Sequence, residues 1–164
     1  MKYEKLNQND YDRVWDTFEA RFLFKPDYYG SVPAISEPEG SIVFRFKAEF
    51  SDAELDSLDA LFREAFAELT PEGEAMYALD WQHESYRFDP HSDYTGMPIG
   101  VFPDGDYFII LSEQIDMGTF GHPWQGTICV FGDKLVRFIE SRQPSIFERI
   151  ERRNTQPGGG TLRR

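Results

Sequence analysis

The chain has 164 residues, a formal net charge of -12 and 40% hydrophobic residues. A chain of this length buries enough surface to fold as one domain without disulfides. Its balance of 40% hydrophobic and 28% charged residues is typical of globular proteins and argues against the disordered and fibrous classes. No apolar run approaches the roughly 18 residues that a spanning helix requires, and the polar amino terminus lacks a secretory signal. We therefore expect a cytoplasmic protein with no membrane partner and a single, reduced cysteine.

The first third of the chain predicts one helix and one strand. Apolar residues recur at helical spacing over residues 10–22, and either Asn9 or Asp10 is available as the cap. A loop rich in proline and glycine follows. Apolar and basic side chains then alternate over residues 41–48, which predicts a strand with one solvated face.

An acidic helix comes next. Ser51 and Glu54 form a capping box, in which each side chain satisfies a backbone amide at the helix start. The helix ends near Thr70 and Pro71. Its apolar residues lie on one stripe, so most of its carboxylates are expected on the solvated face.

Three extended segments and a last helix complete the predicted elements. Residues 76–88 have the pattern of a long strand whose apolar face changes parity, which a bulge near residues 83–85 explains. Two nearly all-apolar runs, 107–111 and 127–131, predict central strands covered on both faces. The final helix spans about 133–141.

This order of elements predicts an α+β fold: a mainly antiparallel sheet of about four strands, with helices packed against it, in a single domain. We place the domain at residues 1–150, with a short helical stretch through Ile146 and Ile150 near its end. Residues 151–164 combine arginines with three consecutive glycines, so we expect a disordered basic tail there.

Negative charge is concentrated in the middle of the chain. Residues 49–116 carry seventeen acidic residues, and their only basic residues are Arg63 and Arg87. Such a surface repels phosphate, so we expect no nucleic-acid partner. It attracts a basic protein and speeds the encounter with it, although solubility alone is another reason for such charge.

No catalytic or cofactor motif in the sequence is strong enough to identify a function by itself. The segment HESYR at 83–87 begins like a zinc-protease motif, but it has Arg where a second His is required and lies in a predicted strand. Asp104 and Asp106 flank a glycine after Pro103, which is typical of a turn rather than of a calcium loop. Cys129 has the pattern of a small buried hydrophobe. We predict no metal site and no cofactor.

Two long connections, 89–106 and 112–126, are candidates for a binding surface. Connections of about 15 residues are uncommon unless they bind something or are disordered. Trp124 lies in the second one, where an interface role and a core role both stay open. The candidate binding residues are Trp81, His83, Asp104, Asp106, His122 and Trp124.

Four segments of the sequence carry a family resemblance. They are YALDWQH at 77–83, FPDGDY at 102–107, GTFGHPW at 118–124 and ICVFG at 128–132. Together they resemble the bacterial family known as domain of unknown function 2716, from the first helix to the last. That resemblance implies family membership and brings no reaction, cofactor or catalytic residue with it.

These observations predict a non-enzymatic, acidic protein-binding module. Its sharper form is an immunity or antitoxin-like inhibitor of a basic toxin, such as a nuclease. One alternative is a hydrolase-type enzyme that uses His83 or His122 as its base, with Asp80, Asp104 or Asp106 as the orienting carboxylate. Another is a sugar-binding module that stacks its ligand on four rings: Trp81, Tyr86, Tyr94 and Trp124.

Overall fold

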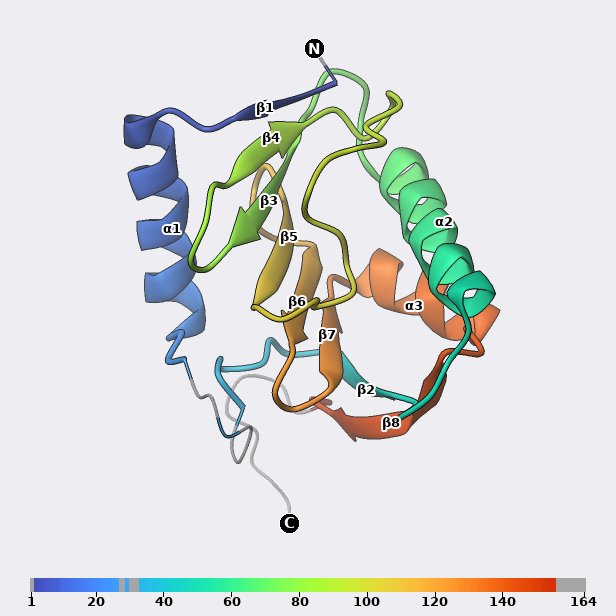
Figure 1. Ribbon diagram of the computed structural model, residues 1–164. Coiled ribbons are helices and arrows are strands. Elements are labelled where there is room, and N and C mark those ends of the chain that lie inside the picture. The colour runs from blue at the N-terminus through green and yellow to red at the C-terminus, as the bar shows by residue number, and fades with distance from the viewer. Residues whose placement is uncertain (1, 27–28, 30–32, 156–164) are drawn as a thin grey trace.

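The computed structural model describes residues 2–26, 29 and 33–155, which form three helices and eight strands (Figure 1). The helices are α1 (Gln8–Phe22), α2 (Asp52–Leu69) and α3 (Asp133–Arg142). The strands are β1 (Tyr3–Lys5), β2 (Ile42–Phe46), β3 (Met76–Asp80), β4 (Tyr86–Phe88), β5 (Phe108–Ser112), β6 (Gly118–His122), β7 (Thr127–Phe131) and β8 (Phe147–Arg153). All eight strands join one antiparallel sheet in the order β1-β4-β3-β5-β6-β7-β2-β8.

The sheet separates two hydrophobic cores. Helix α1 packs on one face, while α2 and α3 cover the other (Figure 1). Successive side chains of a strand point to opposite faces, so Ile109 joins the core under α1 and Ile110 joins the core under α2. The predicted α+β class, single domain and antiparallel sheet are confirmed. The predicted number of about four strands is wrong.

The two long helices begin at side-chain caps. The Ser51 and Glu54 capping box is confirmed: the Glu54 amide donates to Ser51 Oγ at 3.1 Å, and the Ser51 amide donates to Glu54 Oε1 at 3.0 Å. Helix α1 starts earlier than predicted. Its cap is Asn7, whose Oδ1 accepts from the Asp10 amide at 2.8 Å.

The segment 76–88 is a hairpin and not one bulged strand. Strands β3 and β4 pair with Met76 opposite Phe88, and the chain turns between them. Ser85 holds this turn, because its Oγ accepts from Trp15 Nε1 at 3.1 Å and from the Asp80 amide at 3.4 Å. The change of parity in the sequence therefore marks a reversal of the chain.

The predicted connection 112–126 contains strand β6. Gly118 and Gly121 gave it the composition of a loop, yet the strand needs both glycines. A Cβ on Gly118 would lie 2.0 Å from the Ile110 carbonyl oxygen, and one on Gly121 would lie 2.9 Å from Pro103. Close approach of neighbouring atoms thus explains why a fully buried strand carries them.

The end of the described chain is also a strand. Residues 147–153 form β8 along β2, where a short helix through Ile146 and Ile150 was predicted. Its register against β2 shifts twice, so its apolar residues do not alternate regularly. Residues 151–153, placed in the predicted tail, belong to this strand, while residues 156–164 of that tail lie outside the described residues.

The connection 89–106 packs against α2. Its Tyr94, Ile99 and Val101 are buried in the core under α2 and α3, and the Arg63 guanidinium lies 4.2 Å above the Tyr94 ring. None of the helices in the described part of the chain has the length and hydropathy that crossing a bilayer requires.

Candidate functional site

The register of the central strands brings several predicted site residues to one end of the sheet. Phe108 pairs with both Asp80 and Gly121, so the neighbouring residues Trp81, Tyr107 and His122 lie close together. Tyr107 is fully buried at the centre of this group, and its ring centroid lies 4.9 Å from that of His122. The corresponding distances are 5.5 Å to Trp81 and 5.1 Å to Trp124. We call Trp81, Tyr107, His122 and Trp124 the aromatic cluster.

His122 is packed inside this cluster. It is 2% exposed, and its Nδ1 accepts a hydrogen bond from the Gln125 amide at 3.2 Å. The hollow beside it, lined also by Phe120 and Cys129, measures about 10 Å³. That volume holds at most one water molecule. His122 is therefore positioned as a core residue, while Trp124, at 36% exposed, forms the outer part of the cluster.

Asp80, His83 and Asp106 form a second group next to the aromatic cluster. His83 lies in the turn between β3 and β4 and not in a strand. Its Nδ1 is 3.2 Å from the carboxylate of Asp80 and 3.6 Å from Oδ2 of Asp106. Asp106 directly precedes Tyr107, whose amide donates to Asp106 Oδ1 at 2.8 Å. We call these three residues the carboxylate–histidine cluster.

The electrostatics of this cluster follow from one buried carboxyl group. Burial raises the pKa of Asp106 to about 6, and the neighbouring Asp80 carboxylate adds to the rise. The hydrogen bond that His83 donates to the Asp80 carboxylate raises the pKa of His83, and Asp106 adds to that effect. The cluster thus combines a histidine that favours its charged form with one buried carboxyl group, that of Asp106, which holds its proton more strongly than usual.

Five of the six predicted binding residues therefore lie in these two adjoining clusters. The exception is Asp104, which is exposed in the turn before Asp106 and makes no ion pair with a described residue. The four rings of the sugar-binding alternative do not form one platform. Tyr94 belongs to the core under α2, whereas Trp81 packs against the core under α1.

A hollow of about 390 Å³ lies near the amino terminus of α3 and the carboxyl terminus of α2. Leu69, Met117 and Leu135 give it apolar walls. Its acidic lining residues are Glu74, Asp116 and Asp133, and its basic one is Lys134. We call this feature the acidic hollow. Its residues come from three separate segments, 69–74, 112–117 and 132–135, so no local sequence pattern pointed to it; the acidic excess of 49–116 was the available signal.

Most carboxylates of residues 49–116 remain without a basic partner. Four of the seventeen pair with Lys or Arg: Glu54, Asp59, Glu64 and Glu84. Four others lie within 4.0 Å of a histidine nitrogen: Glu72, Asp80, Asp89 and Asp106. The other nine make no ion pair with any residue in the described ranges: Glu49, Asp52, Asp56, Glu68, Glu74, Asp93, Asp104, Glu113 and Asp116. All nine except Glu74 are exposed.

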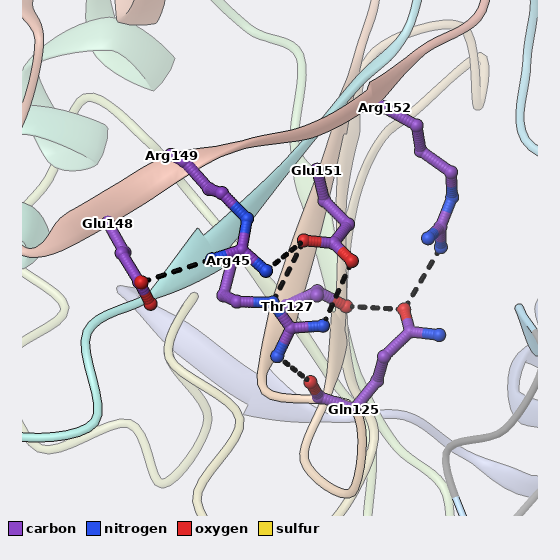
Figure 2. Close-up of polar contacts among 7 residues, drawn as sticks. All are labelled: Arg45, Gln125, Thr127, Glu148, Arg149, Glu151 and Arg152. Atoms are coloured by element: carbon purple, nitrogen blue, oxygen red, sulfur yellow. Dashed lines mark hydrogen bonds and ion pairs between the residues drawn. The ribbon is translucent and has the colours of Figure 1, made fainter.

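The arginines of β8 and of its neighbour β2 are paired with carboxylates, in contrast to the acidic residues above (Figure 2). We call this part of the sheet, with Arg45, Arg149, Arg152 and Arg153, the β8 edge. Arg45 binds both carboxylate oxygens of Glu151 at 2.9 and 3.1 Å and donates to the Gln125 carbonyl at 2.9 Å. Arg149 lies 3.0 Å from Glu148 and 3.2 Å from Glu151.

The same pairing continues along β8. Arg152 binds Glu37 through Nε and Nη2. It also donates to Gln125 Oε1 at 3.0 Å (Figure 2). Arg153 pairs with Glu140 of α3. The positive charge of this edge is therefore neutralised within the fold.

Comparison with known proteins agrees with the sequence resemblance. Residues 5–136 match the family described as "Protein of unknown function (DUF2716)". The chain is also 32% identical over 160 residues to a Bacillus subtilis (strain 168) protein described as "Uncharacterized protein YxiI". That match covers 90% of this chain and 98% of the relative. No solved structure matches the chain.

Proposed function

The chain belongs to the DUF2716 family, a family of unknown function, and from that premise we propose that it is a non-enzymatic module that binds a basic protein. The acidic hollow is the centre of the binding surface. The sharper form of the proposal is an immunity or antitoxin-like inhibitor of a basic toxin, such as a nuclease.

The observation that carries the proposal is the contrast in charge pairing. The described arginines of β8 are bound to carboxylates, whereas nine carboxylates of 49–116 face solvent or the hollow without a cation. Unpaired surface charge of one sign accelerates the encounter with a partner of the opposite sign. It also repels nucleic acid, which supports a protein as the partner.

The acidic hollow fits a lysine or arginine side chain of such a partner. Its apolar walls suit the aliphatic stem of that side chain, since long basic side chains bury their methylene groups against apolar surface. Glu74, Asp116 and Asp133 supply the negative charge for the cationic end. Ser112 Oγ donates to Asp116 Oδ1 at 2.8 Å, which orients this carboxylate before any partner arrives.

The experiment compares two variants of equal charge. Glu74→Gln/Asp116→Asn/Asp133→Asn removes the three carboxylates of the hollow, while Glu49→Gln/Asp56→Asn/Asp104→Asn removes three exposed carboxylates elsewhere. Each protein is immobilised and used to capture partners from a bacterial lysate at about 0.1 M and about 1 M salt, between which the Debye length falls from about 10 Å to about 3 Å.

We expect wild type and the second variant to retain a basic protein at low salt, and the hollow variant to lose it. High salt should release it from both. Equal retention by the two variants would show that the hollow is not the binding site. Absence of any basic partner released by salt would contradict the proposal as a whole.

A second candidate is a hydrolase-type activity based on His83. The contact between His83 and the carboxylates of Asp80 and Asp106 favours it, because a general base needs an orienting carboxylate within hydrogen-bond reach. His122 is a poorer base for this purpose, since it is buried and beside a hollow the size of one water molecule. His83→Gln should abolish any ester or phosphodiester hydrolysis that the wild type shows, and unchanged turnover would reject this role.

A further inference from the structure

We propose that the carboxylate–histidine cluster is a binding site for a divalent transition-metal ion of the Zn²⁺ or Mn²⁺ type, with Asp80, His83 and Asp106 as its protein ligands. One ligand atom from each residue lies within 4.8 Å of the others. The site is separate from the acidic hollow, and the inference does not depend on the binding of a protein partner.

The first argument is an unsatisfied oxygen. Asp106 is 6% exposed, and no described residue donates a hydrogen bond to its Oδ2. This atom points into the cluster, 3.6 Å from His83 Nδ1. Apart from this ion-pair contact with the exposed His83, the oxygen has no hydrogen bond from a described residue, and a buried carboxylate oxygen without one costs free energy, so the atom needs an explanation. A metal ion between these side chains provides one.

The second argument is the spacing of the ligand atoms. His83 Nδ1 lies 3.2 Å from Asp80 and 3.6 Å from Asp106 Oδ2. Zinc binds nitrogen and carboxylate oxygen at about 2.1 Å, which places two ligands of a tetrahedral ion about 3.4 Å apart. The two observed distances bracket that value. Both carboxylates therefore stand at the separation from the imidazole that a shared ion requires.

The third argument is the way the carboxylates are held. The Gln82 amide donates to Asp80 Oδ1 at 3.3 Å, and the Tyr107 amide donates to Asp106 Oδ1 at 2.8 Å. In Asp106 this leaves Oδ2 for the ion, and in Asp80 Oδ2 is also within 3.2 Å of His83 Nδ1. Hydrogen bonds that orient ligands are a regular part of metal sites. Here they come from the backbone at the ends of β3 and β5.

The ligand set indicates the class of ion. One imidazole nitrogen with two carboxylate oxygens suits Zn²⁺ or Mn²⁺, whereas Ca²⁺ takes six to eight oxygens and Mg²⁺ keeps an octahedral shell of oxygens. The His83 side chain is 71% exposed, so the ion can enter from solvent and keep water in its remaining positions. On binding, the ion therefore loses only the water molecules that the three protein ligands replace.

The test is calorimetric titration of the untagged full chain with Zn²⁺ alone and with Mn²⁺ alone. We expect one ion per chain. We also expect Asp106→Asn and His83→Gln to weaken binding at least about 10-fold. Asp104→Asn is the matched control, because it removes an exposed carboxylate two residues from Asp106 and should bind as wild type does. Ca²⁺ and Mg²⁺ should bind far more weakly.

Thermal unfolding without metal shows whether the variants fold. Asp106→Asn removes one of two neighbouring carboxylates, and His83 is exposed, so both variants should remain folded. The unfolding temperature of the wild type should rise with Zn²⁺ or Mn²⁺ concentration, and that of the variants should not. The proposal is overturned if the wild type binds neither ion at one per chain, or if either variant binds as tightly as Asp104→Asn.

Discussion

The β8 edge and the acidic segment 49–116 use charge in opposite ways. At the β8 edge, arginines and glutamates lie within hydrogen-bond distance and cancel one another (Figure 2). In the acidic segment, exposed residues such as Asp56 and Glu68 make no ion pair with a residue in the described ranges. The difference teaches that net charge counts residues, whereas the surface a partner meets depends on which charges the fold has already paired.

The largest expected loss of stability comes from breaking an ion pair of the β8 edge, the one between Arg152 and Glu37. The Arg152 guanidinium and Glu37 are mostly buried, with 31% and 15% of their side chains exposed. Arg152→Met leaves the Glu37 carboxylate without its partner, and we expect a loss of about 2 kcal/mol in the free energy of unfolding. Urea denaturation measures this loss. Arg152→Lys should lose less, and a Met variant as stable as wild type would show that the pair contributes nothing.

Glu54, an acidic residue of 49–116 that has a basic partner in Lys47, should stabilise the fold as the ion pairs of the β8 edge do. The hydrogen bond from Lys47 and the Ser51 amide hold the pKa of Glu54 at about 2. A lowered folded-state pKa stabilises the fold above the ordinary value near 4.5, and this stabilisation is lost as the pH falls toward about 2. Glu54→Gln should thus be less stable than wild type at neutral pH. Denaturation at a series of pH values should show that difference closing in acid; a constant difference would contradict it.

A smaller effect is expected for the exposed arginine of the same edge. Arg149 is 54% exposed in its side chain, and Glu151 keeps Arg45 when Arg149 is removed. Exposed pairs contribute about 0.2 to 1 kcal/mol. Arg149→Met should therefore reduce the free energy of unfolding by no more than about 0.5 kcal/mol. A loss as large as that of Arg152→Met would mean that the exposure of an ion pair does not determine how much it contributes to stability.

The smallest effect, and one of opposite sign, is expected at an unpaired carboxylate. Glu68 lies in the last turn of α2, where the helix dipole disfavours negative charge and no basic residue compensates. Glu68→Gln should leave the free energy of unfolding unchanged or raise it by up to about 0.5 kcal/mol. Destabilisation in the same urea assay would show that this carboxylate supports the fold and is not held only for a partner.

The sequence predicted the elements whose signals are local. Helical spacing and the Ser51 and Glu54 capping box located α2, and the apolar run 127–131 is strand β7 as predicted. The parity change in 76–88 was also a real signal. We interpreted it as a bulge, and the pairing of β3 with β4 shows that it is a turn instead.

The missed strands lack a local signal for physical reasons. Strand β6 contains glycines that long-range contacts require, such as Gly118 against the Ile110 carbonyl. Strand β8 shifts register against β2, which removes its alternation. Strand β1 has only three residues, two of them charged.

The site residues were predicted individually, but their grouping was not. His83 and Asp106 are 23 positions apart and meet because β3 and β5 are neighbours, a fact of topology that no spacing rule contains. Asp104 does not join them: two residues before Asp106, the chain is in an exposed turn, and a binding role for Asp104 stays a prediction. Burial, which distinguishes the two aspartates, depends on the completed sheet.

The order of the strands has one more consequence. Every open sheet offers unpaired amides and carbonyls along its two outermost strands, and these invite a further strand from another molecule. Here the outermost strands are β1 and β8, with the sequences YEK and FERIERR. A chain that added itself to either would have to strip water from lysine, arginine and glutamate side chains. Both margins of the sheet are thereby guarded against polymerisation, while the strands most prone to aggregate, β5 and β7, stay enclosed at its centre.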